Sequence, residues 1–496
     1  MHTYNILNNC VTNASQCSYL EEYCKNGIQT KKPKPTTFND LIQNSDEFKI
    51  KFPNERCRIK NQPRDSLTSI ADEGSTAYPV ILEHVLILYC SFLEHKKKFG
   101  TEIEKNIYEE MTMEGFIERL LMKRCVSFFG KNERYLLRSG EVGNSGFKAI
   151  GTVQEQPPLI MEDYLTYDEI KLSAFISFSS TFKNRVMIGI CGPEMSRKGL
   201  MDYQDVIIAK VQNQPENGYG KMAKNVSKDI QGKFDKRSIW NTFYRCKVSQ
   251  VYNGIDRKET RGKSWRSPKE LQRYIRINNT TDFCDSSILE NRYCAMIMLI
   301  LQESNARAKE QNKMAYVWIN KSRMGLEKMT NWQEEYFLRI FVSVTVLLFG
   351  DSLYNIYCIH FENFAENCWI KDDTILNNNN DCDPYFWNKH PNKGIKIRLS
   401  TTDADRDYKK SIRDDENYVN ISTYTANANS LPGNEFWMKK INTCDKNSTS
   451  YLACHSFISE LHNPFINRPM ISARNLHIAT EYNVHHISEY SEMMLK

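Results

Sequence analysis

Short apolar runs alternate with longer amphipathic stretches through the second half of the chain. The runs are rich in β-branched and aromatic residues, which is typical of strands buried inside a sheet. The intervening stretches, such as residues 331–349 and 455–461, have helical spacing. This alternation predicts an α/β fold with a largely parallel central sheet. The predicted strands are residues 186–190, 206–209, 315–319, 353–361, 395–399 and 418–421.

Helical patterns dominate the first part of the chain. Residues 79–99 have a broad apolar stripe that suits a buried helix. Residues 101–129 form a second helical stretch, in which Thr101 and Glu104 have the spacing of a capping box. Residues 135–138 favour a strand, and residues 164–180 favour a helix that ends in a Ser-rich loop.

These patterns divide the chain into consecutive regions. We expect a polar N-terminal extension over residues 1–75 and a helical region over 76–130. The α/β core would then span 131–480, with a basic helical insertion around 221–290, and residues 481–496 would form a C-terminal tail. The sequence leaves open whether residues 1–130 fold onto the core or act as a separate recognition module.

Composition narrows the function classes. The net charge of +6 is small for 496 residues, so it gives no basis for expecting nucleic-acid binding. The longest apolar run, residues 341–349, is too short to span a bilayer. The N-terminus lacks the basic segment followed by an apolar core that is typical of a signal peptide, so we expect no classical signal peptide. We therefore expect a soluble, cytoplasmic protein that contacts no membrane, with non-classical secretion as the alternative.

The 15 cysteines are scattered, and none forms a CxxC pair. This spacing gives little support to a zinc site and favours reduced thiols, so we expect no metal and no cofactor. Cys10, Cys17 and Cys24 recur at intervals that would place them along one side of a helix.

The segment of the chain with the most unusual composition is residues 423–437, directly after the predicted strand 418–421. It combines small residues, amides, one Pro, one Gly and one carboxylate. Such a loop brings backbone N–H groups close to a ligand, while its amide side chains can bind sugar or phosphate. Because ligands of parallel sheets bind at the carboxyl ends of strands, the position of this loop predicts a binding site.

Several sequence blocks, in the same order along the chain, resemble the MavL-like family. They lie at residues 163–174, 179–181, 199–202, 213–220, 315–317, 429–437 and 458–467. That family is similar to macrodomains of the poly(ADP-ribose) glycohydrolase branch. The resemblance implies a macrodomain-like central mixed sheet flanked by helices. It also implies a pocket for ADP-ribose as ligand or product, and an ADP-ribosylated protein as partner. The composition further suggests an insect or insect-virus homologue, similar to the parasitoid killing factors.

The same resemblance suggests which residues bind and react. The family's acidic positions correspond here to Glu435 and Asp445, which we predict to be catalytic. A carboxylate could activate water beside an oxocarbenium-like centre. The residues expected to contact ligand are Asn427, Asn429, Ser430, Gly433, Asn434, Ser179 and Ser180.

Two departures from the family pattern leave the function open. Asn427 stands where the family has an Asp, and Asn cannot act as a base. Residues 182–186 join the next strand with little of the family's acidic insertion. The first hypothesis is therefore an ADP-ribose-binding hydrolase, and the first alternative is a catalytically impaired homologue acting as a toxin or host-interaction factor with a host protein partner. The second alternative is an ADP-ribosyltransferase, suggested by Arg138 and residues 179–181.

Overall fold

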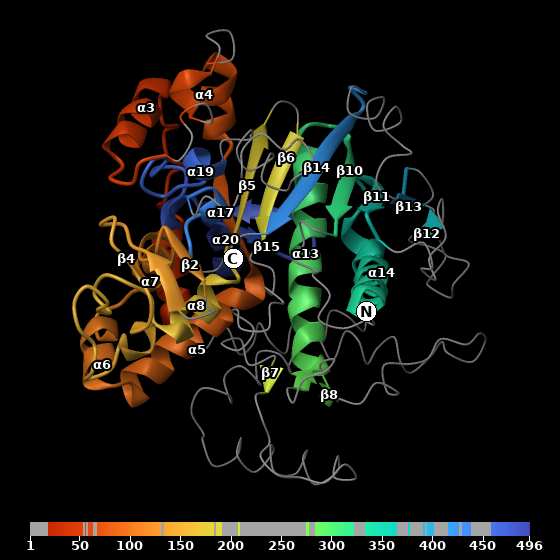
Figure 1. Cartoon of the computed structure of the whole chain (residues 1–496). Helices are drawn as coiled ribbons and strands as arrows, with labels where there is room; N and C mark the ends of the chain where they lie inside the picture. The colour runs from red at the N-terminus through yellow and green to blue at the C-terminus, as the bar shows by residue number, and fades with distance from the viewer. Residues whose placement is uncertain are drawn as a thin grey trace.

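The computed structural model describes the chain in several separate ranges (Figure 1). The statements below concern the described residues, which are 18–52, 55, 58–62, 67–129, 133–182, 185–190, 207–208, 274–276, 283–321, 333–364, 375–376, 390–391, 394–400, 415–425, 429–437 and 458–496.

A ten-stranded mixed sheet forms the centre of the fold, in the order β12-β13-β11-β10-β14-β6-β5-β1-β15-β16. The pairings place β13, β11, β10, β14, β6, β1 and β15 in one direction, and β12, β5 and β16 in the other. The strands are β1 (Tyr78–Leu82), β5 (Ser177–Phe182), β6 (Arg185–Ile190), β10 (Met314–Asn320), β11 (Ile356–Glu362), β12 (Ile375–Leu376), β13 (Ile395–Ser400), β14 (Tyr418–Thr425), β15 (His477–Ala479) and β16 (Val484–His486).

This arrangement confirms the predicted α/β class with a macrodomain-like mixed sheet. In the central strand β10, Ala315, Val317 and Ile319 are buried, and so are the alternate residues Tyr316 and Trp318. Burial on both faces explains why the strand's sequence is a continuous apolar run rather than an alternating one. The predicted strands at 186–190, 395–399 and 418–421 are confirmed as β6, β13 and β14.

Two long helices pack against the sheet. Helix α13 (Ser286–Glu310) contacts β6, β10 and β14, and α14 (Gln333–Ser352) packs beside it. Figure 1 shows α13 in green along the strands and α14 next to it. The prediction of a helix followed by a strand around residues 331–361 is confirmed by α14 and β11.

A helical lobe and several short helices complete the described part. The lobe consists of α5–α8 and the small sheet β2-β3-β4, seen at the lower left of Figure 1. Its elements are α5 (Glu83–Phe99), α6 (Glu102–Tyr108), α7 (Met113–Met122), β2 (Ser127–Phe129), β3 (Arg134–Leu136), β4 (Val142–Gly143) and α8 (Tyr167–Ser173). The remaining elements are α2 (Ser18–Gly27), α3 (Phe38–Glu47), α4 (Leu67–Ser75), β7 (Ile207–Ile208), β8 (Tyr274–Arg276), β9 (Phe283–Asp285), α17 (Asn434–Trp437), α19 (Ile458–Leu461) and α20 (Ile487–Leu495).

Two sequence predictions about local structure were wrong. Residues 78–82 form strand β1 rather than the start of a helix, because β5 and β15 bond to both of its edges. Residues 177–182 form strand β5 rather than a Ser-rich loop, because β1 and β6 flank them. In both cases strand partners that are distant in the chain decided the conformation. The capping box of Thr101 and Glu104 at the start of α6 is confirmed.

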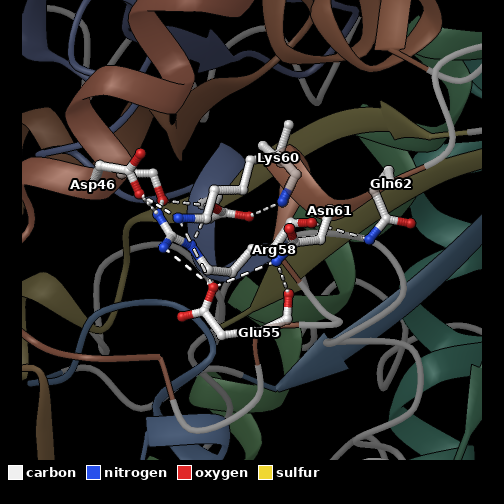
Figure 2. Close-up of polar contacts among 9 residues, drawn as sticks. Asp46, Glu55, Arg58, Lys60, Asn61 and Gln62 are labelled. Atoms are coloured by element: carbon white, nitrogen blue, oxygen red, sulfur yellow. Dashed lines mark hydrogen bonds and ion pairs between the residues drawn. The ribbon is translucent and has the colours of Figure 1, made fainter.

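The N-terminal segment is packed onto the rest of the molecule. Thr36 donates a hydrogen bond to Asn467 at 2.6 Å, and the Phe52 and Trp437 rings lie 4.4 Å apart. A cluster of polar side chains around Arg58 lies at the end of this segment (Figure 2). The Arg58 guanidinium donates hydrogen bonds to Asp46 at 2.7 Å and to Glu55 at 3.5 Å. Strand β1 also joins the main sheet, so the expected boundary between regions at residue 130 does not coincide with a break in the sheet.

None of the helices in the described ranges combines the length and apolarity that a bilayer crossing needs. Cys24, Cys90, Cys125, Cys294 and Cys358 are buried free thiols. Cys10 and Cys17 lie outside the described residues.

Candidate functional site

The loop that follows β14 begins at the carboxyl edge of the sheet. Thr425, the last residue of β14, pairs with Ile190, the last residue of β6. The predicted ligand residue Asn427 and the predicted catalytic residue Asp445 lie outside the described residues. The described part of the loop resumes at Asn429 and leads into α17.

Backbone bonds tie this loop to the segment before β2. Cys125 N–H donates to the Asn429 carbonyl at 3.1 Å, and Leu431 N–H donates to the Cys125 carbonyl at 2.8 Å. The Ser430 hydroxyl accepts a bond from Phe128 N–H at 2.8 Å. Asn429 and Ser430 are fully buried, and the bonds above involve the Asn429 backbone carbonyl and the Ser430 side chain. Their assignment to a ligand stays a prediction.

Gly433 sets the entry into α17. Its φ is +83°, a backbone conformation that side chains disfavour, and an added Cβ would lie 2.9 Å from Ser459 Cβ. Glycine at this position lets α17 start directly beside Ser459, just after the start of α19. Asn434 is buried as the first residue of α17, and Glu435 is the second.

The two predicted ligand serines lie inside β5. The Ser179 hydroxyl accepts bonds from Arg307 Nε at 3.2 Å and Nη2 at 3.0 Å. The Ser180 hydroxyl lies 2.7 Å from His462 Nε2. Both hydroxyls are buried and engaged by protein groups, and their contact with a ligand stays a prediction.

His462 links three elements through its two ring nitrogens. Nδ1 lies 2.6 Å from the Tyr424 hydroxyl near the end of β14, while Nε2 reaches Ser180 on β5. Tyr424 can occupy this position because Gly189 has no Cβ, which would lie 2.2 Å from the Tyr424 hydroxyl oxygen. Burial lowers the pKa of His462 to about 3, with a smaller contribution from Arg307. The imidazole is therefore neutral at physiological pH and holds the base of the loop in place.

A small cavity lies at the same carboxyl edge, and its volume of about 20 Å³ is room for about one water molecule. Leu82 at the end of β1, Ile190 at the end of β6 and Ser177 at the start of β5 form one wall. The facing wall comes from α13, through Arg292 and neighbouring apolar residues. Because Ile190 pairs with Thr425, the cavity lies next to the start of the β14 loop.

Arg292 is the charged group of this cavity. The side chain is 4% exposed, and its guanidinium lies over the Phe175 ring at 4.4 Å from the centroid. Nη2 has no hydrogen-bond partner, and no carboxylate in the described ranges forms an ion pair with Arg292. The carboxyl of Glu290, on the same helix, accepts a bond from the Tyr336 hydroxyl, and burial raises its pKa to about 7.

Neither Arg292 nor Phe175 was among the residues predicted from sequence. The sequence does contain a pattern that includes Arg292. Arg292, Met296 and Leu299 have helical spacing, which places Arg292 on an apolar face of a helix. A lone cation on such a face is a sequence feature that merits attention. Phe175 offered no comparable pattern, since its role depends on the approach of α13. Nowhere in the described ranges do three His, Cys, Asp or Glu side chains gather closely enough to hold a metal ion.

Comparison with known proteins gives a consistent result. The family model described as "ADP-ribosylhydrolase MavL-like" matches residues 39–184 and 181–493. A Drosophila melanogaster protein named ADP-ribosylarginine hydrolase CG2909 is 34% identical over 482 residues, which is 92% of this chain and 90% of that protein. A second Drosophila protein, named ADP-ribosylarginine hydrolase CG3568, is 33% identical over 512 residues, which is 98% of this chain and 94% of that protein.

Proposed function

The chain belongs to the MavL-like ADP-ribosylhydrolase family, and from this premise we propose that it removes ADP-ribose from arginine side chains of modified proteins. The observation that most supports this proposal is the 34% identity to a protein named ADP-ribosylarginine hydrolase, which extends over nine-tenths of both chains. The proposed partner is accordingly an ADP-ribosylated protein, and free ADP-ribose is the product.

The position of the β14 loop supports this activity. The loop starts at the carboxyl edge of the sheet, where parallel sheets bind ligands. Its described part is fixed by Gly433 and by the bonds of residues 429–431 to Cys125 and Phe128. A fixed loop can hold a carboxylate in place during reaction, and Glu435 follows Gly433 by two positions.

The proposed reaction is hydrolysis of the N-glycosidic bond. Glu435 takes a proton from water, the water oxygen attacks C1 of the ribose, and the bond from C1 to the arginine nitrogen breaks. The released guanidine receives a proton, for which Asp445 is the proposed donor or positioning group. Asn427 is proposed to hydrogen-bond a ribose hydroxyl, a task that needs an amide and no base.

Release of ADP-ribose from an arginine-modified protein tests this proposal. We expect the wild-type protein to be active and Glu435→Gln to lower kcat by about 10²- to 10⁴-fold, because it removes a general base. ADP-ribose binding should survive in this variant. Glu416→Gln is the matched control, since Glu416 is exposed before β14, at the opposite edge of the sheet.

The other outcomes select the alternatives. Binding of ADP-ribose by the wild-type protein without release from a modified protein would identify a catalytically impaired homologue. Sustained nicotinamide release from NAD, without hydrolysis, would identify a transferase. Either result would reject the hydrolase proposal.

A further inference from the structure

The carboxyl group of Glu290 on α13 has one oxygen without a partner in the described part of the chain. Oε2 accepts a hydrogen bond from the Tyr336 hydroxyl of α14 at 2.8 Å. Oε1 accepts none, and no Lys, Arg or His within the described ranges forms an ion pair with Glu290. The side chain is half-buried, and Oε1 is not among the fully enclosed polar atoms, so it is open to solvent. One oxygen of the group is therefore available to a ligand.

The arrangement of the two helices places Glu290 at the carboxyl edge of the sheet. The first turns of α13 lie there, because Arg292 lines a cavity with Leu82 and Ile190, which end β1 and β6. Helix α14 follows β10 and precedes the parallel strand β11, so its first turn, which contains Tyr336, lies at the same edge. Since α13 also contacts β10 and β14, the pair of Glu290 and Tyr336 lies at the edge where the β14 loop starts.

The surroundings of Glu290 favour the arrival of a cation. Removal from water raises the pKa of Glu290 to about 7, and the bond from Tyr336 opposes this rise only in part. A cation that reaches Oε1 would favour the carboxylate form and would in turn be held by it. Within the described residues the protein supplies no such cation, so the geometry suits one that arrives with a ligand.

A guanidinium is the cation that matches this group best. Its planar N–H donors fit carboxylate oxygens, and it is more weakly hydrated than an ammonium, which favours it in partly buried ion pairs. The substrate of the proposed reaction contains such a group, since ADP-ribose is attached there to the guanidinium of an arginine. ADP-ribose linked to a serine or to a carboxylate brings no cation. A carboxylate at this edge therefore provides a basis for arginine specificity.

We propose that Glu290 binds the guanidinium of the modified arginine and thereby makes the site specific for arginine-linked ADP-ribose. This inference rests on the proposed function and deepens it, because it names a residue that recognises the leaving group rather than the ADP-ribose. Glu290 is thus a substrate-binding residue on α13, remote in sequence from the loop that contains Glu435. Tyr336 holds the carboxyl group through Oε2 and leaves Oε1 for the substrate.

Calorimetric titration of the full chain with ADP-ribosylagmatine and with free ADP-ribose tests the inference. Agmatine carries the guanidinium of arginine, and the Glu435→Gln background keeps the bound ligand intact. At pH 8, where the Glu290 carboxylate predominates, we expect ADP-ribosylagmatine to bind more tightly than ADP-ribose. Adding Glu290→Gln should weaken ADP-ribosylagmatine binding by about tenfold to a hundredfold, the range for a hydrogen bond to a charged group, and should leave ADP-ribose binding unchanged.

Further variants separate recognition of the guanidinium from a general effect of charge. Glu335→Gln removes an exposed carboxylate from the first turn of α14, where Arg339 pairs with it, and should change neither affinity. Glu290→Asp keeps the charge on a shorter side chain, so it should retain part of the preference for ADP-ribosylagmatine. An equal loss in Glu335→Gln and Glu290→Gln would overturn the inference.

Stability separates a binding role from a structural one. Glu290→Gln keeps an acceptor for the Tyr336 hydroxyl and removes a partly buried charge without a counter-ion, so the melting temperature at pH 8 should be unchanged or higher. A lower melting temperature, together with an equal loss of affinity for both ligands, would identify a structural role and overturn the inference.

The outcomes distinguish this inference from the hydrolase proposal. Equal ADP-ribosylagmatine affinity with and without Glu290→Gln would overturn the inference and leave the hydrolase proposal standing. A preference for ADP-ribosylagmatine that depends on Glu290, without release of ADP-ribose by the wild-type protein, would support the guanidinium site and reject the hydrolase. If Glu290→Gln fails to fold, Tyr336→Phe gives the same test, because it releases the carboxyl group and should reduce the preference without removing the charge.

Discussion

At the scale of single residues, burial acts in opposite directions on two ionisable neighbours. It raises the pKa of Glu460 to about 7, against the bonds from Ser45 and Ile59 that favour the carboxylate. It lowers the pKa of His462 to about 3. Each group is therefore held in its neutral form more strongly in the folded protein than in the unfolded chain. The two groups favour stability at opposite ends of the pH range.

The pH dependence of Glu460→Gln follows from the sign of that shift. The folded pKa of Glu460 lies above its unfolded value of about 4.5, so its contribution to stability is complete below pH 4.5 and is lost as the pH rises towards 7. Relative to wild type, the free energy of unfolding of Glu460→Gln should therefore increase by about 3 kcal/mol from pH 4.5 to 7. Urea titrations at several pH values measure this difference.

Glu416→Gln, at an exposed position, provides the control: its difference from wild type in the free energy of unfolding should stay constant with pH. If that difference is also constant from pH 4.5 to 7 for Glu460→Gln, Glu460 is not held neutral by burial.

The pH dependence of His462 has the opposite sign. Its contribution to stability is present above pH 6.5 and is lost as the pH falls towards 3.

At the scale of elements, the strand β14 and the helices α17 and α19 are joined by few but well-defined contacts. Ser430 bonds to the backbone of β2, and Tyr424 on β14 contacts His462 just after α19. Gly433 permits the close approach of the loop to Ser459. The position of Glu435 in α17 thus depends on contacts made by its neighbours in the loop.

Ser430→Ala tests how firmly the loop is held. The substitution leaves the buried N–H of Phe128 without its acceptor, which should lower stability by about 1–3 kcal/mol. If Glu435 is catalytic, kcat should fall while the affinity for ADP-ribose changes less. Ser75→Ala removes an exposed hydroxyl that bonds only locally to Asp72, and should change stability by less than about 0.5 kcal/mol. Equal effects of both substitutions would contradict the proposed anchoring.

At the scale of the whole molecule, the N-terminal segment packs against α17 and α19, the two short helices next to the loop that follows β14. Phe48 and Phe52 pack on Trp437 of α17 at ring distances of 5.5 and 4.4 Å. The Arg58 cluster of Figure 2 continues to Glu460 of α19, whose carboxyl group accepts a hydrogen bond from the Ile59 N–H at 2.7 Å. Residues that the sequence left open as a separate module therefore hold the two short helices in position.

Phe52→Ala tests whether the packing of the N-terminal segment on α17 affects stability and activity. Removing a buried ring in contact with Trp437 should cost about 3 kcal/mol of stability and lower the hydrolytic rate, because α17 loses its support. Phe99→Ala is the control, since that ring is 57% exposed at the end of α5. Denaturant unfolding and the ADP-ribose release assay measure both effects. Full activity of a destabilised Phe52→Ala would show that α17 does not need this packing for catalysis.

The sequence by itself determined the elements whose cause is local. Apolar β-branched runs predicted β6, β13 and β14, and the spacing of Thr101 and Glu104 predicted a helix start. The ordered blocks at residues 163–467 indicated the family, and the loop after β14 was recognised from its composition. These features follow from period, propensity and capping, which neighbouring residues specify together.

Only the tertiary structure decided which distant segments meet. It inserted β1 between β5 and β15, which turned a predicted helix start and a predicted loop into strands. It also buried Ser179 and Ser180 against Arg307 and His462, and within the described residues it left Nη2 of the buried Arg292 without a hydrogen-bond partner. The physical reason is that strand pairing, desolvation and charge compensation depend on partners far away in the chain, and local sequence does not specify those partners.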